Sequence, residues 1–423
     1  MTHVDGADPV SILIHEKLVG LTPNAPEYCI FRVHTLLRRV NEKAYDPQLL
    51  AIGPYHRDKD GLKLMEDHKL HYLQLLLRRR GETSVETYIN AMRKLESRTR
   101  RCYAEPISLS TNEFVEMMLL DGCFIIELFR KFVMWDLIDQ RDPIFQFSWM
   151  LYSLKRDLLL FENQIPFFVL TKLFEMTEVP NWQSNLIHLA VRFSQATLLP
   201  FECRIFESFH ESFSDIEHLL ALLYKFATPS IKSEDAEEKL ISIPSATEIQ
   251  EAGVKLKKLQ SGSFFDIKFD NGVLEIPSLR IEDRSESVFR NLIAYEQYTQ
   301  DNHFNYVTDY VTLMDYLINS PKDVELLRRR GIIENFLGDD EAVSTMFNKL
   351  VENVILSNFC YNKIFTDLNK HCSRRKNVWI ANLRHKYFNS PWALISFLAA
   401  AFLLLLALAQ TIFSIFSYIF PRN

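Results

Sequence analysis

Two short stretches of this chain carry side chains suited to acid–base chemistry. The first is Glu162-Asn163-Gln164, which lies between the apolar runs 158–161 and 165–170. Polar groups in such surroundings are expected to be partly buried, and a buried carboxylate whose pKa is raised can act as a general acid or base. Glu296 has a similar apolar frame. Together the two carboxylates would be a minimal set for acid–base hydrolysis.

The same residues also suit a purely structural role, which we favour. Asn163 and Gln164 are good caps for a helix that opens near Pro166. Glu162 can join two helices by accepting hydrogen bonds from backbone N–H groups or from arginine.

A second candidate motif is Gly53-Pro54-Tyr55-His56. His56 has the chemistry of a proton shuttle or a metal ligand, but a single histidine after a turn is more often a hydrogen-bonded structural residue. The sequence has no glycine-rich phosphate loop, no G-x-S-x-G elbow, and no three or four ligands at metal-binding spacing. We therefore predict no cofactor and no metal, and assign no catalytic residue.

The elements that would position these residues are mainly helical. The chain has 423 residues, 48% of them hydrophobic and only 11 of them glycine, which is typical of a folded, helix-rich protein. Apolar periodicity predicts a central core helix at 110–132, opened by a Ser110–Glu113 capping box. Further helices are expected at 62–80, 84–103, 149–161, 166–176, 182–196, 216–226, 285–297, 306–318, 323–330 and 341–356.

One β element interrupts the helices. Residues 264–269 and 273–276 flank Asp270-Asn271-Gly272, and Asn-Gly favours the tight turn of a hairpin. A strand at 254–259 could pair beside it. The acidic stretch 229–239 reads as a linker between possible sub-lobes at 28–228 and 240–388, after a partly flexible N-terminal segment, 1–27.

The C-terminal stretch 391–420 is apolar and long enough to span a membrane once, so lipid is the expected partner of this helix. Trp392 stands at its start, where tryptophan suits the lipid–water interface. Basic residues before the helix outnumber the single Arg422 after it, which places the body in the cytoplasm by the positive-inside rule. The basic flank comprises Arg374, Arg375, Lys376, Arg384 and Lys386.

Composition bears on three further properties: nucleic-acid binding, disulfide bonds and membrane topology. A net charge of −6 and a pI near 6.1 argue against nucleic acid as a partner. The six cysteines are scattered, so no disulfide framework is indicated. No Asn-x-Ser/Thr acceptor occurs, which also favours a cytoplasmic body, although the opposite topology stays open as an alternative.

Several segments, in order along the chain, resemble a plant-specific family catalogued as domain of unknown function 247. The similarity covers about residues 30–410, with His34 and Ala51 standing where that family usually has proline and serine. It implies a mostly helical, membrane-associated plant protein with no established reaction. Some members of that family in grasses are associated with pollen–stigma self-incompatibility. The matching segments are IFRVHTLLRRVNEKAYDPQLLAIGPYHR, LKLMEDHKLHYLQLLLRR, LLLFENQIPFFVLTKLF, FDIKFDNGVLEIPSLRIED, NLIAYEQ, DVELLRRRGIIENFLGDDE and PWALISFLAAAFLLLLALAQ.

We therefore expect a mainly α protein: a large helical body with a small β-hairpin element and one C-terminal transmembrane helix. The expected role is interaction or recognition in signalling at the plasma membrane, with a protein partner that the sequence does not identify. The alternative is a membrane-bound enzyme that uses a buried carboxylate such as Glu162.

Overall fold

A computed structural model describes residues 8–19, 27–179, 185–195, 216–228, 242–260, 262–299, 305–356, 359–374 and 391–419. The chain divides into two compact units. Unit 1 comprises Met1–Val33, Pro47–Phe193 and Phe213–Leu222, and unit 2 comprises His34–Asp46, Ser194–Ser212 and Leu223–Asn423. The two units thus interleave along the sequence, and residues 34–46 belong with the later part of the chain. The expected linker 229–239 lies outside the described residues.

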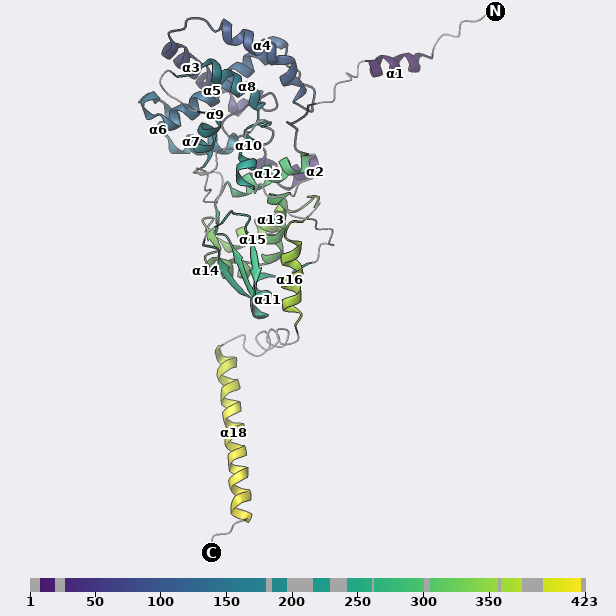
Figure 1. The fold of residues 1–423 in the computed structure, drawn as a ribbon, viewed down its shortest axis with the longest axis vertical. Coiled ribbons are helices and arrows are strands. Elements are labelled where there is room, and N and C mark those ends of the chain that lie inside the picture. The colour runs from purple at the N-terminus through teal and green to yellow at the C-terminus, as the bar shows by residue number, and fades with distance from the viewer. Residues whose placement is uncertain are drawn as a thin grey trace, which may run out of the picture. The chain divides into compact units, whose positions relative to one another are not determined.

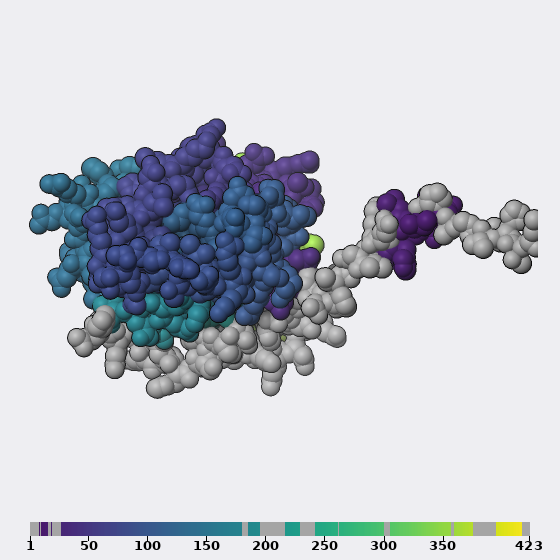
Figure 2. All heavy atoms as spheres, turned by 90° about the horizontal axis from the view of Figure 1, so that it is seen from above, coloured from purple at the N-terminus to yellow at the C-terminus, as the bar shows by residue number. Residues whose placement is uncertain are grey.

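Unit 1 is built around α5 (Thr111–Val133), which is buried along most of its length. Among the described helices that pack against it are α3 (Leu64–Arg80), α4 (Glu86–Arg101) and α8 (Phe167–Met176). The apolar residues of α5 point in every direction, so only a helix enclosed by others can bury them all. Blue segments of the chain, among them parts of α3–α5, cover much of the face of unit 1 seen in Figure 2.

Local signals set the ends of these helices. Ser110 and Glu113 form the expected capping box at the start of α5. Gly81 ends α3 in the left-handed conformation, with φ 68°. Pro166 is the N-cap of α8, one residue before the position expected of it. The other described helices that fall wholly within unit 1 are α1 (Pro9–Val19), η2 (Asp60–Leu62), η3 (Trp135–Leu137), α6 (Pro143–Gln146) and α7 (Ser148–Asp157). Helix α9 (Leu186–Gln195) belongs to unit 1 up to Phe193, and its last two residues are assigned to unit 2.

Unit 2 combines helices with two small sheets (Figure 1). In the first, β2 (Lys268–Asp270) and β3 (Val273–Ile276) form the expected hairpin, with Asn271 and Gly272 both at positive φ, and β1 (Lys255–Lys258) pairs with β3 in parallel. The second sheet is a parallel pair that the sequence did not indicate, β4 (Leu279–Ile281) and β5 (Ile333–Asn335).

The helices of unit 2 pack mainly on one another and on these sheets, with contacts between α12 and α13, α14 and α15, and α16 and β2. They are α2 (Thr35–Val40), η1 (Glu42–Ala44), α11 (Ala246–Glu251), α12 (Ser285–Tyr298), α13 (Tyr306–Leu317), α14 (Pro321–Arg329), α15 (Asp340–Leu350) and α16 (Asn362–Cys372). Helix α10 (Leu219–Ala227) begins in unit 1 and ends in unit 2.

The last described element is α18 (Pro391–Ile419), one continuous apolar helix. Its segment Ile395–Phe416 is long and apolar enough to cross a membrane and is not buried against the rest of the chain. Of the expected basic flank, Arg374 follows α16, whereas Arg375, Lys376, Arg384 and Lys386 lie outside the described residues. Trp392 is in the first turn of α18.

Candidate functional site

The segment Pro47–His56 of unit 1 is mostly buried, yet it belongs to no helix or strand. Buried backbone N–H and C=O groups need hydrogen-bond partners, because an unmade bond costs the full desolvation penalty. Here side chains supply those partners. Four side chains hold this segment directly, and Glu162 and Gln164 hold the chain beside it. We call these six residues the polar clamp: Lys69, Asp121, Asp157, Glu162, Asn163 and Gln164.

Asp157, the last residue of α7, accepts hydrogen bonds from three consecutive backbone N–H groups. Oδ2 lies 3.0 Å from Gln48 N, 2.7 Å from Leu49 N and 2.9 Å from Leu50 N. Burial raises the pKa of Asp157, and these donors and the neighbouring Arg156 guanidinium oppose that shift. The carboxylate therefore supplies the hydrogen-bond acceptors that a neighbouring strand would otherwise provide to this part of the segment.

Asn163 continues the same pattern. Its Oδ1 accepts from Ile52 N at 2.7 Å, while Nδ2 donates to the carbonyls of Leu50 and Asp157, both at 2.9 Å. Each of its groups is thus used to join Pro47–His56 to the turn after α7. This turn explains why α7 ends at Asp157 and not at the expected residue 161.

Asp121 and Lys69 hold the residues on either side of Ile52. Gly53 N donates to Asp121 Oδ2 at 2.7 Å, and Lys69 Nζ lies 2.6 Å from Asp121 Oδ1 and 2.7 Å from Ala51 O. Burial raises the pKa of Asp121, and the Lys69 ammonium opposes this. Both side chains are buried, so the pair is held in a dry environment where a missing partner is costly.

Gly53 allows the segment to approach Gln164. Its φ is 71°, and a Cβ there would lie 2.5 Å from Gln164 O. That carbonyl also accepts a hydrogen bond from the Tyr103 hydroxyl at 3.0 Å. The Gln164 amide donates to Leu158 O and Leu160 O, and its Oε1 accepts from Leu220 N.

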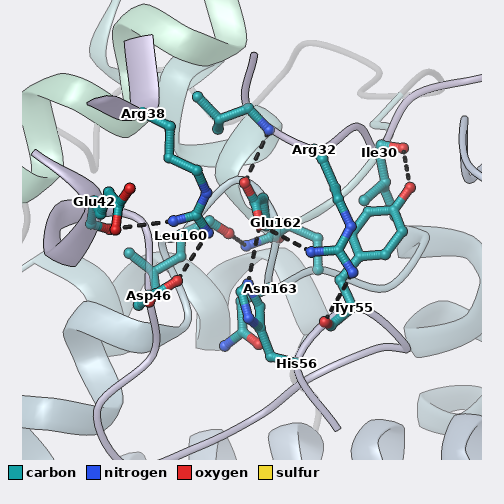
Figure 3. Close-up of polar contacts among 12 residues, drawn as sticks. Ile30, Arg32, Arg38, Glu42, Asp46, Tyr55, His56, Leu160, Glu162 and Asn163 are labelled. Atoms are coloured by element: carbon teal, nitrogen blue, oxygen red, sulfur yellow. Dashed lines mark hydrogen bonds and ion pairs between the residues drawn. The ribbon is translucent and has the colours of Figure 1, made fainter. Parts of the chain in front are cut away.

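Glu162 lies beside His56 and Arg32 (Figure 3). Its Oε1 accepts from Val33 N at 2.9 Å, and its Oε2 lies 3.2 Å from His56 Nε2 and 3.7 Å from Arg32. Glu162 and His56 are both buried. Arg32 is partly exposed, lies over the Tyr55 ring and pairs with Glu105 at 2.9 Å.

Glu296 belongs to unit 2 and has a different set of partners. It accepts hydrogen bonds from Val307 N, Thr308 N and the Thr308 hydroxyl, at the first turn of α13, and from the Tyr224 hydroxyl. Burial raises its pKa to about 7, against the opposing effect of these donors. The carboxylate therefore supplies the helix N-terminus with acceptors.

The structure brings Glu162, Asn163, Gln164, Gly53 and His56 together in unit 1 and places Glu296 in unit 2 with its own partners. The carboxylates of Glu162 and Glu296 are buried and each accepts backbone N–H groups, which is the geometry of a structural acceptor. Pro54 and Tyr55 lie within the same segment, and the Tyr55 hydroxyl donates to Ile30 O. Over the described ranges, no group of three or more His, Cys, Asp or Glu side chains could hold a metal ion.

Sequence reasoning missed Lys69, Asp121 and Asp157. A signal existed for Asp121, since it is a charge inside the apolar run 117–126 of the expected core helix. A charge at such a position must have a buried partner. Nothing local identified that partner as the backbone of Gly53, because the two residues are far apart in sequence.

Comparisons with known proteins find similarity over most of the chain. A family model described as a plant protein of unknown function matches residues 30–406. The UPF0481 protein At3g47200 of Arabidopsis thaliana is 32% identical, over 92% of this chain and 87% of its own. The putative UPF0481 protein At3g02645 of the same plant is 23% identical, over 92% and 90%. No solved structure shows a significant match.

Proposed function

Since this chain belongs to the plant protein family of unknown function catalogued as domain of unknown function 247, we propose that it is a membrane-anchored interaction module. Its helical body faces the cytoplasm at the plasma membrane and binds a protein partner there in signalling or recognition. The observation that carries this proposal is α18, whose apolar segment Ile395–Phe416 finds no burial in the chain itself. An uncovered apolar helix of that length is stable in lipid and not in water.

The polar clamp supports a non-catalytic body. A general acid or base must reach a proton on the substrate, at about 2.6–3.2 Å. Glu162 is instead enclosed, with one oxygen on Val33 N and the other beside His56. Removing it would leave a buried donor without an acceptor, so its role is to hold the segment that carries Arg32 and Val33.

Exposed aromatic side chains in unit 1 favour the proposal that this unit binds a protein partner. Trp135 is 79% exposed and Trp149 is 60% exposed, and Phe147 is also exposed. Tryptophan is enriched in the residues that dominate protein–protein binding energies, and exposing it to water has no stabilising effect on the chain itself. We propose that these residues contact the partner.

Crosslinking of the full-length chain in sealed plant membranes tests the proposal. We expect one partner to crosslink through unit 1, and the Trp135→Ala/Trp149→Ala double variant to lose it. Phe336→Ala, which removes an exposed aromatic of unit 2, is the matched control and should retain the crosslink. Protease added outside sealed vesicles should cut the body when the cytoplasmic face of the membrane is turned outward. It should leave the body intact when that face is turned inward.

The enzyme alternative makes an opposite prediction. Turnover of a small molecule by the purified full-length chain, abolished by Glu162→Gln while the fold is retained, would contradict an interaction role for this body. Loss of the fold in Glu162→Gln, together with partner capture by the folded Phe336→Ala chain, would support the structural role of Glu162.

A further inference from the structure

Two cysteines that are far apart in sequence meet at the edge of unit 1. Cys29 N and Ile30 N both donate to Cys102 O at 2.9 Å, and Ala104 N donates to Ile30 O at 3.0 Å. Ile30 and Tyr103 form a parallel β-bridge, so Cys29 and Cys102 are register neighbours immediately before it. Register neighbours have Cα atoms about 5 Å apart, which is within the range that a disulfide spans.

The thiols are directed at one another. The two side chains are hydrogen-bonded, and Cys102 also lies 3.5 Å from the carbonyl of Arg98. Cys29 is partly exposed, whereas Cys102 is buried. A small oxidant therefore reaches the pair from the side of Cys29, and the two thiols are already in hydrogen-bond contact.

The surroundings favour a thiolate on one of the two sulfurs. The hydrogen bond from Cys29 lowers the pKa of Cys102, burial and the charge of Glu27 oppose this, and the charges of Arg98 and Arg101 add to the lowering. The same contact raises the pKa of Cys29. The thiolate is the form that reacts with peroxide, so the lowered pKa makes Cys102 the more reactive sulfur of the pair, whereas burial raises the pKa of Cys123.

We propose that Cys29 and Cys102 form a reversible dithiol–disulfide site that is oxidised by peroxide. The Cys102 thiolate attacks one oxygen of hydrogen peroxide, the O–O bond breaks, and the products are a Cys102 sulfenic acid and hydroxide. The Cys29 sulfur then attacks the sulfenic sulfur and displaces the oxygen, which leaves as water with the thiol proton. In total, two thiols and one peroxide give one disulfide and two waters.

Oxidation would tie the segment that begins at Cys29 to the end of α4. Cys29 begins the stretch that carries Arg32 and Val33 to Glu162, and Cys102 is the C-cap of α4. A disulfide would join the two covalently, with the clamp contact of Val33 only a few residues beyond the link. In a reducing cytoplasm the site would be a switch and not a permanent staple.

Peptide mapping of the full-length chain in detergent, with and without hydrogen peroxide, tests this site. A Glu-specific protease cuts after Glu27, Glu96 and Glu105, which isolates Cys29 and Cys102 from every other cysteine. We expect a crosslinked peptide pair that is two hydrogens lighter than its separate chains, formed at low peroxide and lost with dithiothreitol. We also expect the melting temperature of unit 1 to rise by about 5 °C or more on oxidation, because the link closes a long loop.

Three variants separate the possible results. Cys372→Ser changes a partly exposed cysteine of unit 2 and should leave the crosslink unchanged. Cys29→Ser should abolish it and leave Cys102 as a sulfenic acid that a dimedone probe traps. If peroxide instead links Cys102 to a third cysteine, or oxidises Cys372 while the wild-type pair stays reduced, the proposal is wrong. Cys102→Ala, judged only if its circular dichroism matches wild type, should also abolish the crosslink.

Discussion

At the residue scale, the unusual feature of this protein is a buried loop whose backbone is held by side chains. Carboxylates and one amide accept from the N–H groups of residues 48–50, 52 and 53. A strand would do the same with carbonyl groups, but acids are stronger acceptors for N–H donors. The arrangement makes each acid important for folding because its loss leaves several buried donors without a partner.

Asp157→Ala tests this directly. The change removes the acceptor of three backbone N–H groups, one of them buried and two partly buried. An orphaned buried donor costs about 1–3 kcal/mol, so we expect a loss of about 3–5 kcal/mol in the free energy of unfolding. Urea denaturation followed by circular dichroism measures it. Asp58→Ala, at an exposed position of the same unit, should stay within about 0.5 kcal/mol of wild type. Equal effects of the two changes would mean that the clamp is dispensable.

Two glycines with nearly the same φ offer a second residue-scale test. Gly53 and Gly81 have φ of 71° and 68°, but a Cβ at Gly53 meets Gln164 O at 2.5 Å, whereas a Cβ at Gly81 meets nothing within 4 Å. Gly81→Ala should therefore cost only the left-handed strain, about 1 kcal/mol, and Gly53→Ala several kcal/mol more. Comparable unfolding midpoints in urea for the two variants would contradict this close approach.

At the scale of elements, two buried acids of unit 2 accept hydrogen bonds from backbone N–H groups at or just before the start of a helix. Glu296 supplies acceptors to the first turn of α13 (Tyr306–Leu317), and Asp309, one turn further along, accepts from Cys360 N at 2.8 Å. Burial raises the pKa of both carboxyl groups to about 7. These two sites connect α13 with the end of α12 and with the turn that precedes α16.

The raised pKa values predict how the stability of unit 2 depends on pH. In the folded state Glu296 titrates near 7, above its ordinary 4.5, so the folded chain holds the proton more tightly than the unfolded chain. The stability that Glu296 contributes is therefore full below about pH 4.5 and is lost as the pH rises through about 7, by an amount on the order of 3 kcal/mol. Thermal unfolding from pH 5 to 8 measures this slope.

A matched pair of variants tests whether Glu296 causes this loss of stability with rising pH. Glu296→Gln cannot ionise, so it should flatten the decline between pH 5 and 7. Glu341→Gln changes an exposed carboxylate at the start of α15 and should leave the decline as it is. A decline that persists unchanged in Glu296→Gln would assign it to other groups, such as Asp309, whose shift has the same sign.

At the scale of the whole molecule, one helix determines how the protein partitions. The segment Ile395–Phe416 of α18 has a mean hydropathy of 2.3 and no burial within the chain. Deleting residues 391–423 should move the protein from the alkaline-carbonate-resistant membrane fraction to the supernatant, with the helical circular dichroism of the body retained. Leu404→Arg, near the middle of the span, should weaken insertion by about 3 kcal/mol. Retention of the truncated chain in the membrane fraction would contradict anchoring through α18.

The sequence by itself determined the local elements. Apolar periodicity and a capping box located α5, the Asn271-Gly272 pair located the hairpin of β2 and β3, and one long uncharged stretch located α18. Each of these signals lies within a few helical turns or a single turn of chain, so the residues that specify the element are also the residues that form it. The resemblance to the plant family likewise rests on such contiguous segments, and the family model matches residues 30–406.

Only the tertiary structure decided which distant groups meet. The polar run Glu162–Gln164 was visible in the sequence, but not that Glu162 accepts from Val33 or that Asp157 serves residues 48–50. The scattered cysteines gave no spacing signal, yet Cys29 and Cys102 are register neighbours. The parallel pairing of β4 with β5 was equally hidden. Such pairings depend on the path of the whole chain, because a donor or thiol carries no local mark of the partner that packing brings to it.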